Sequence, residues 1–359
     1  MLITRPAGGL CESTRRPVSR PPEKSILTNV AAKESKLRKT ILKFFHRPEV
    51  PDHISANFRE IDNAKTATIK SSLEQNFFVR FPDEYLSTEP GQKDLQNHLS
   101  NRLEKDRNLL VPWLDNAKSL RGSRILEIGC GTGCSTVALA EQGAKVSAVD
   151  VDAKSLVVAS DRCGAYGLDA SYFHANATEV DELFSGQHFD FIIFYASLEH
   201  MTIKERLIAM KHTWNMLSTG DLWCVIETPN RLWYYDAHTS FLPFYLWLAD
   251  DLAYQYSRFS PRDNFRELYN DATDNESMLD FLRRGRGASF HEFELAMKPV
   301  EQLNVISSRS AFHRKRKPFD RLARKYSIAD RYISFLSEIA PHLHEGFCQP
   351  TLDLIIRKD

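Results

Sequence analysis

Residues 124–133 read Arg-Ile-Leu-Glu-Ile-Gly-Cys-Gly-Thr-Gly and decide the fold of this chain. The apolar run from Ile125 to Ile128 is typical of a buried strand, and three glycines follow it at alternate positions. A helical pattern begins directly afterwards, at Ser135. A strand, a glycine-rich turn and a helix in this order let the backbone approach a ligand closely and point helix N–H groups at it. The sequence therefore predicts a ligand site at this turn.

The spacing of the glycines distinguishes this turn from a dinucleotide-binding turn, whose third glycine would fall at Cys134. Glu127 also stands near the end of the strand, where a carboxylate suits a cationic ligand better than a pyrophosphate. Residues 126–133 resemble the first motif of class I S-adenosylmethionine-dependent methyltransferases. The resemblance implies that S-adenosylmethionine is the cofactor and that the turn binds it through Glu127, Gly129, Cys130, Gly131, Thr132 and Gly133.

Further strands follow in the order that this family has. We predict them over residues 144–149, 170–175, 189–195 and 222–227, with an amphipathic helix at 203–217. The resemblance covers about residues 120–230. It implies an α/β fold with a Rossmann-like, seven-stranded sheet. The chain's own residues add a helical N-terminal extension and a helical, aromatic insertion after the fifth strand.

The ends of these strands supply the remaining candidate cofactor contacts. Asp150 ends the second strand about 20 residues past the turn, where an acidic side chain in a Rossmann-like unit accepts from two ribose hydroxyls. Asp152 is better placed than Asp150 to cap the next helix. In the family a polar residue after the third strand contacts the adenine amine. Here that residue is Asn176, whose side-chain oxygen can accept a hydrogen bond. Further candidate contacts are Val151, Ala177 and Tyr195.

The rest of the chain divides around this core. We expect a disordered or mobile basic arm over 1–50, a helical cap over 51–118, the core over 119–230, a substrate-covering insertion over 231–300, and closing strands over 301–359. The closing strands are predicted at 303–307 and 351–356, separated by a helical stretch at 319–343. Within the cap, Phe77 to Phe81 is interpreted as a short strand. The arm has a basic helical pattern at 26–46, which suits packing, a partner or a membrane surface.

For methyl transfer from a sulfonium, the protein must bind the two reactants, orient them and exclude water from the site. A base is needed when the acceptor is a hydroxyl. His238 is the first candidate because it follows the fifth strand. His291, beside Glu292, is the second, since a neighbouring carboxylate makes a histidine a better base. His200, close after the fourth strand, is the third. A structural or surface role is the alternative for each histidine.

Composition and missing motifs limit which substrates and which cellular compartment we expect for this protein. Lys plus Arg equals Asp plus Glu, at 47 each, so no overall positive field favours nucleic acid. Six scattered cysteines lack a second metal-binding pair, so we expect no metal, and reduced thiols favour a cytoplasmic protein. The fourth strand is not followed by the motifs of amino-directed or cytosine C5 DNA methyltransferases, so no DNA substrate is expected. No obligate protein partner is inferred.

The leading hypothesis is methyl transfer to an oxygen of a small-molecule, lipid or sugar acceptor. A protein or RNA methyltransferase is the second hypothesis, in which the basic run at 314–317 and the basic arm at 33–43 dock the larger substrate. A non-catalytic, cofactor-binding scaffold is the third. Aromatic residues are dense between 228 and 290, which suits either the core of a lid or an apolar pocket. Peripheral contact with a membrane stays open.

Overall fold

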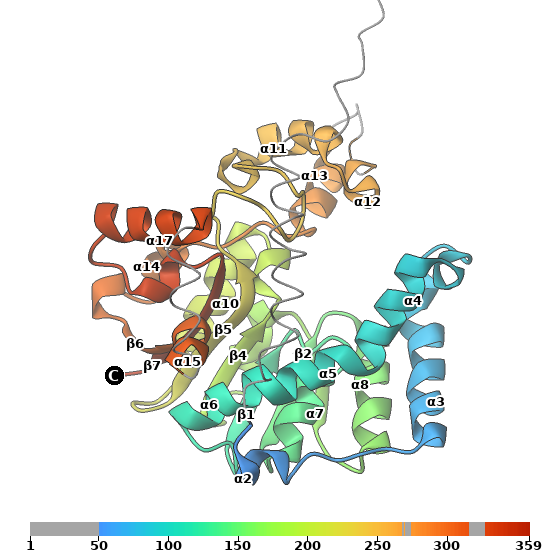
Figure 1. Ribbon diagram of the computed structural model, residues 1–359. Coiled ribbons are helices and arrows are strands. Elements are labelled where there is room, and N and C mark those ends of the chain that lie inside the picture. The colour runs from blue at the N-terminus through green and yellow to red at the C-terminus, as the bar shows by residue number, and fades with distance from the viewer. Residues whose placement is uncertain (1–49, 268, 270–273, 316–326) are drawn as a thin grey trace, which may run out of the picture. The chain divides into compact units, whose positions relative to one another are not determined.

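The computed structural model describes residues 50–267, 269, 274–315 and 327–359, and its centre is a seven-stranded sheet in the order β3-β2-β1-β4-β5-β7-β6 (Figure 1). Strands β1 to β5 run parallel, and β7 runs antiparallel to both β5 and β6. The strands are β1 (Arg124–Ile128), β2 (Lys145–Asp150), β3 (Ser171–His174), β4 (Phe191–Tyr195), β5 (Leu222–Pro229), β6 (Asn304–Ser308) and β7 (Thr351–Arg357). The predicted fold class is confirmed. The strand order reverses at β1, which places the ligand crevice at the carboxyl ends of β1 and its neighbours.

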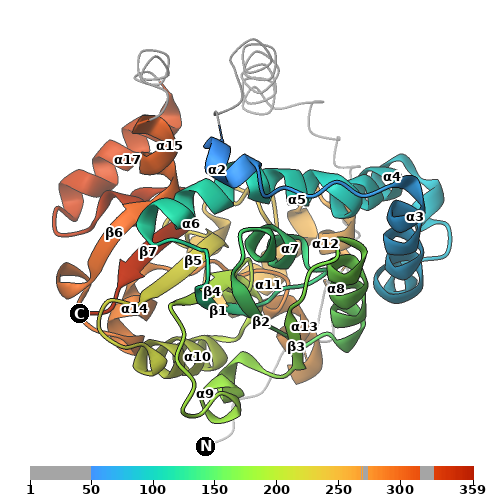
Figure 2. The same cartoon turned by 90° about the horizontal axis from the view of Figure 1, so that it is seen from below.

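Alternate residues of the central strands face two separate cores. Ile125 packs with Trp113 and Val137 on one face, whereas Leu126 packs with Met210 and Phe293 on the other. The first face is covered by α7 (Cys134–Glu141) and α8 (Ala153–Ala165), and the second by α9 (Val180–Leu183), α10 (Ile203–Met216) and α14 (Phe290–Ala296) (Figure 2). A sheet buried on both faces explains the nearly continuous apolar runs of β1, β4 and β5.

The cap before β1 is helical, as predicted. Its helices are α2 (Asp52–Ser55), α3 (Asn63–Ser72), α4 (Glu89–Gln96), α5 (Arg102–Lys105) and α6 (Val111–Ala117). The turns η4 (Asn97–Asn101) and η5 (Asp106–Leu110) join α4, α5 and α6 into one continuous helical stretch.

The predicted strand at 77–81 is wrong. Its first four residues belong to the helical turns η1 (Leu73–Phe77) and η2 (Phe78–Arg80), and Phe81 directly follows η2. Phe78 is buried against a small core that includes Leu95 of α4, so the apolar run serves helix packing rather than a sheet.

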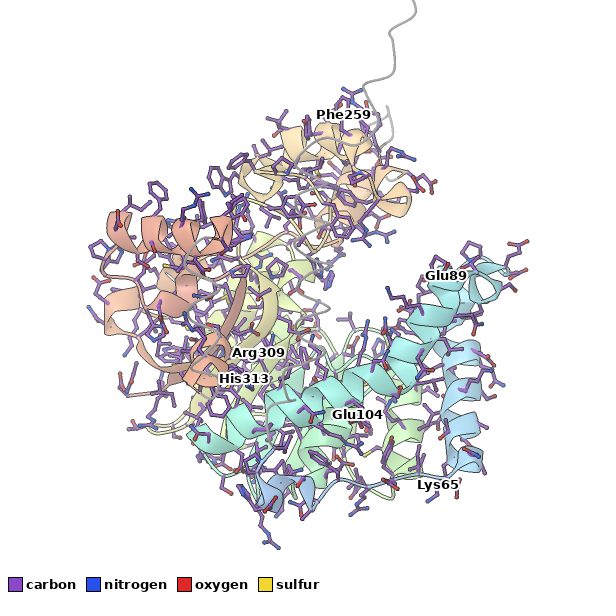
Figure 3. The ribbon with its side chains drawn as sticks, in the orientation of Figure 1. Lys65, Glu89, Glu104, Phe259, Arg309 and His313 are labelled. Carbon is purple, nitrogen blue, oxygen red and sulfur yellow. The ribbon has the colours of Figure 1, made fainter. Side chains whose placement is uncertain are left out.

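The insertion between β5 and β6 has a core of its own. Its helices before α14 are α11 (Asp250–Tyr256), α12 (Asp263–Arg266) and α13 (Asn275–Leu282). Tyr245, Tyr254 and Phe281 pack together at its centre, so much of the aromatic density is lid core. Other aromatic side chains remain exposed, among them Phe259, which lies at the far end of the insertion (Figure 3).

The last two strands are separated by helices, as predicted. These are α15 (Arg309–Lys315) and α17 (Ile328–Ile339); the start of the predicted stretch at 319–343 and the end of the basic run at 314–317 lie outside the described residues. The predicted arm over 1–50 also lies outside them, apart from Val50. Across the described part of the chain, none of the helices has the length and apolar character needed to cross a membrane.

Candidate active site

A cavity of about 1050 Å³ opens at the carboxyl ends of β1, β2, β4 and β5. Its floor is the glycine turn after β1 and the strand ends. One wall comes from the cap, and another comes from the insertion. The cap and the insertion contribute Phe77, Arg80, Phe81, Arg102, Lys105, Asp106, His238, Thr239, Arg262, Phe265, Asp280, Arg283 and Arg284. Helical segments far apart in the chain therefore enclose the strand ends on two sides.

The glycines of the turn have different tasks. Gly131 has φ +50°, and a Cβ built there would meet no atom of the described residues within 4 Å, so the turn leaves open cavity at this point. Gly133 has φ +78°, and its Cβ would lie 2.8 Å from the Ala159 backbone of α8. Gly131 therefore gives room to a ligand, whereas Gly133 lets α7 and α8 pack closely.

The other residues of the turn lie at the cavity and are held by backbone contacts. The N–H groups of Gly129 and Cys130 both donate to the Val149 carbonyl of β2. The hydroxyl of Thr132 lies 3.1 Å from Nδ1 of the buried His98. Gly129, Cys130 and Thr132 all line the cavity, so the turn is fixed in shape before any ligand arrives.

Glu127 does not line the cavity, contrary to the predicted contact with a ligand. It is fully buried, and its two carboxylate oxygens accept hydrogen bonds from the hydroxyls of Ser135 and Thr136. Burial raises the pKa of the Glu127 carboxyl, and these two hydrogen bonds oppose the rise. The carboxylate therefore ties β1 to the first turn of α7, where negative charge is favourable.

Asp150 and Val151 lie where the sequence places them, at the end of β2 and on the cavity. One Asp150 oxygen accepts the Gly131 N–H at 2.8 Å, and the other accepts the Asp152 N–H at 2.9 Å. Each carboxylate oxygen keeps a lone pair, so both can also accept a ribose hydroxyl. Val151 exposes 65% of its surface, which gives the cavity an apolar platform beside this carboxylate.

Asn176 and Ala177 also line the cavity, but the proposed chemistry of Asn176 changes. Its side-chain oxygen accepts from both the N–H and the hydroxyl of Thr178, at 3.0 Å each. Both lone pairs of that oxygen are used, so the group left for a ligand is the amide NH₂, a donor. A donor suits a ring nitrogen of adenine rather than its exocyclic amine.

Tyr195 reaches the cavity at the end of β4 and donates a 2.6 Å hydrogen bond to Asp106 of the cap. Burial raises the pKa of the Asp106 carboxyl to about 7, although the bond from Tyr195 opposes the shift. The sequence prediction missed Asp106. Its signal was a charge on the apolar face of the cap helix, between Leu103 and Leu110 at helical spacing.

Glu227 is a second residue that sequence reasoning missed. It has φ +58°, an uncommon backbone conformation for a residue with a side chain, at the bulge where β5 leaves regular pairing with β7. Its carboxylate pairs with Lys105 of the cap and, at 3.0 Å, with Arg309 of α15. Strain of this kind concentrates at functional sites. Here it turns a charged group into the cavity between the cap and the sheet.

Two of the three candidate histidines meet at the cavity. His200 follows β4 and His238 follows β5; both line the cavity, and their ring centroids are 6.1 Å apart. His291 is exposed on α14, stacks on Phe290 and is not a lining residue. Its neighbour Glu292 is buried and bonds Arg206 and Ser289 instead, because adjacent helical residues do not face each other. His291 is therefore not retained as a candidate base.

Comparison with known proteins agrees with this geometry. Residues 125–220 match the family model described as a methyltransferase domain. The match and the sheet order both agree with the resemblance of residues 120–230 to class I S-adenosylmethionine-dependent methyltransferases.

The curated relatives matched by this domain include ubiquinone biosynthesis O-methyltransferases. The protein of Aromatoleum aromaticum is 36% identical over 93 residues, which are 26% of this chain and 39% of the relative. The protein of Pseudomonas aeruginosa (strain LESB58) is 33% identical over 104 residues, which are 29% of this chain and 44% of the relative. The chain thus spans about two fifths of the length of these relatives. Among solved structures, magnesium protoporphyrin IX methyltransferase from Synechocystis has a TM-score of 0.34 and 20% identity, and the match covers 50% of this chain and 82% of that one.

Replacing Asp150 with alanine should weaken binding of S-adenosylhomocysteine by about 1.5–3 kcal/mol, the scale for losing charge-assisted hydrogen bonds. Isothermal titration calorimetry measures this. Asp190→Ala is the control, because Asp190 lies at the amino end of β4, opposite the carboxyl ends that carry the cavity, and pairs with Lys118. A folded Asp150→Ala protein that binds as tightly as wild type would show that the carboxylate does not hold the ligand.

Proposed function

We propose that this chain transfers the methyl group of S-adenosylmethionine to a hydroxyl oxygen of a small-molecule acceptor. The observation that carries the proposal is one cavity that combines the glycine turn and Asp150 with two histidines able to activate a hydroxyl. The methyltransferase domain match and the O-methyltransferase relatives support it.

The residues at the turn fit this cofactor. Gly131 leaves open space, Asp150 offers acceptor lone pairs, Val151 offers an apolar platform and Asn176 offers an amide donor. When bound, S-adenosylmethionine supplies a methyl group on a sulfonium, which needs only a positioned nucleophile. In this proposal the four residues bind the nucleoside end and leave the rest of the cavity to the acceptor.

The protein's own contribution is to exclude water and to move one proton. Phe77 and Phe81 of the cap and Phe265 of the insertion give the cavity apolar walls. His200 and His238 stand at the ends of β4 and β5, where imidazole can take the proton of an acceptor hydroxyl. A hydroxyl that has lost its proton attacks the methyl carbon far more readily.

A phenolic hydroxyl is the acceptor chemistry that this arrangement suits best. The pKa of a phenol is near 10, which brings its proton closer to the range of imidazole than that of an aliphatic alcohol. The relatives are named for ubiquinone biosynthesis, so phenolic quinone precursors are the first acceptors to test. We extend the proposal to the cytoplasm, because the five cysteines of the described residues are all free thiols.

Calorimetry and a transfer assay test the proposal in turn. S-adenosylhomocysteine should bind wild-type protein, and Gly131→Ala should bind it about 10- to 100-fold more weakly, the scale of an overpacked contact. Gly122→Ala is the matched control, since Gly122 also has positive φ and an open Cβ direction but lies away from the cavity.

Methyl transfer is then measured with labelled S-adenosylmethionine and a panel of phenols, sugars and aliphatic alcohols. We expect label in the phenols. Binding without transfer to any member of the panel would favour a scaffold. Absence of binding in folded protein would overturn the proposal altogether.

A further inference from the structure

Glu199, His200 and His238 bring one carboxylate and two imidazoles together at the cavity. Their ligand atoms all lie within 4.8 Å of one another, and Nε2 of His200 is 4.0 Å from Oε1 of Glu199. The first two residues lie in the turn η7 (Leu198–His200) after β4, and the third comes from the insertion. Two elements thus converge on one point: the turn after β4 and the insertion that covers the cavity.

The carboxylate of Glu199 is buried and incompletely satisfied. Its Oε2 accepts the Thr228 hydroxyl at 3.1 Å, but Oε1 has no hydrogen-bond partner among the described residues. The nearby Arg206 directs its hydrogen bonds elsewhere, to Glu292 and to backbone carbonyls such as that of Leu198. Buried charges are generally paired or coordinate a metal. An unpartnered carboxylate oxygen beside two imidazoles therefore favours binding of a cation at this point.

The hydrogen bonds of both imidazoles leave Nε2 as the lone-pair atom. His200 Nδ1 lies 2.8 Å from the Arg283 carbonyl, which can only accept, so Nδ1 carries the proton. His238 Nδ1 lies 2.9 Å from the Thr239 hydroxyl, which donates its own hydrogen to the Gly285 carbonyl at 2.9 Å. This Nδ1 is therefore also the donor. Metal-bound histidines have this arrangement, with the second ring nitrogen donating to a fixed acceptor.

We propose that Glu199, His200 and His238 bind a divalent transition-metal ion of the Zn²⁺ type, which holds the acceptor hydroxyl; the proposal rests on the methyl transfer proposed above. Two imidazoles and one carboxylate suit zinc, cobalt, nickel or iron(II) and not Mg²⁺ or Ca²⁺, which prefer oxygen ligands. Three protein ligands leave a coordination position open to the cavity, as in catalytic zinc sites.

The site needs only a small closure to bind the ion. Bonds of 2.0–2.1 Å in a tetrahedral site put ligand atoms about 3.4 Å apart, so the present separations, which are within 4.8 Å, must shorten by up to about 1.4 Å. Both histidines are exposed enough to rotate; the side chain of His200 is 46% exposed. A second cluster, of His188, Asp190 and Asp221, carries no such proposal because Lys118 already pairs with both carboxylates.

The ion would act on the acceptor, not on the cofactor. A hydroxyl bound to a divalent metal loses its proton near neutral pH, as zinc-bound water does. The proton leaves to solvent. The oxygen lone pair forms the new C–O bond, and the electrons of the C–S bond stay on sulfur, which becomes a neutral thioether. With the ion bound, the metal replaces imidazole as the group that activates the hydroxyl, and His200 and His238 act as its ligands.

Co²⁺ titration of the chelator-treated full-length protein tests the site without any methyl acceptor. We expect one equivalent to bind by calorimetry and to give the visible absorption of a low-coordinate cobalt site. Glu199→Gln and His238→Ala should each lose at least about tenfold in affinity, given that even outer partners of a metal ligand cost 10–100-fold. His212→Ala is the control, since His212 of α10 pairs with Asp181 of α9 and does not line the cavity.

The outcomes separate this proposal from the proposed function. Normal binding of S-adenosylhomocysteine by the two variants shows that they are folded. If one equivalent of Co²⁺ binds but no methyl transfer is found, the metal site is retained and the proposed methyltransferase function is overturned. Methyl transfer at an undiminished rate in chelator-treated protein, or Co²⁺ binding that Glu199→Gln leaves unchanged, would overturn the metal site.

Discussion

Replacing Arg206 with alanine should destabilise the protein by about 3–5 kcal/mol, the cost of breaking a buried ion pair by removing one partner. The Arg206 side chain is 1% exposed and lies 2.9 Å from Glu292, whose side chain is 8% exposed. The variant leaves that carboxylate buried without its cation. It also deprives the carbonyls of Leu198, Arg286 and Gly287 of their donor.

Urea denaturation measures the free energy of unfolding, and Arg283→Ala is the matched control. Arg283 also pairs with a carboxylate of α10, Glu205, at 2.7 Å, but its side chain is 43% exposed. An exposed pair of this kind contributes about 0–1 kcal/mol. Equal losses in the two variants would show that burial of the Arg206 pair does not set its contribution.

The position of Arg206 links this stability to the site. Its guanidinium joins α10 to the turn that carries His200 and to the strand-like segment at 286–288 of the insertion. The glycine turn and Asp150 depend on other contacts, to β2 and α8. The acceptor side of the cavity should therefore loosen before the cofactor side does.

The sheet could be predicted from sequence because a strand that is buried on both faces needs a continuous run of apolar residues, and each central strand has one. The predicted and observed strands differ by at most two residues at each end, for example 189–195 against Phe191–Tyr195. The error at Phe77 to Phe81 has the same origin. A short apolar run that packs under a helix has the composition of a strand.

Side-chain direction is what the sequence could not provide. Glu127 stands in the right motif, but two hydroxyls of α7 take its carboxylate away from the cavity. His291 stands beside a carboxylate in sequence and not in space. Glu227 could not be predicted at all, because its position depends on a bulge in the pairing of β5 with β7. Each case depends on a tertiary contact that no local pattern records.

Replacing His238 with alanine should lower turnover about 10²–10⁴-fold and leave the affinity for S-adenosylhomocysteine unchanged, the scale for losing hydroxyl activation. His200→Ala should behave in the same way. His291→Ala is the control and should turn over normally, because His291 is exposed on α14 and away from the cavity. The readouts are kcat with a phenolic acceptor and calorimetry with the cofactor product.

The double variant of His200 and His238 decides how the two imidazoles act. If they hold one ion with Glu199, either single change removes the ion, and the double variant should be no slower than the worse single variant. If they acted independently, the two losses would multiply. Normal turnover in both single variants would place hydroxyl activation elsewhere in the cavity, and Asp106, whose pKa burial raises to about 7, is the next group to replace.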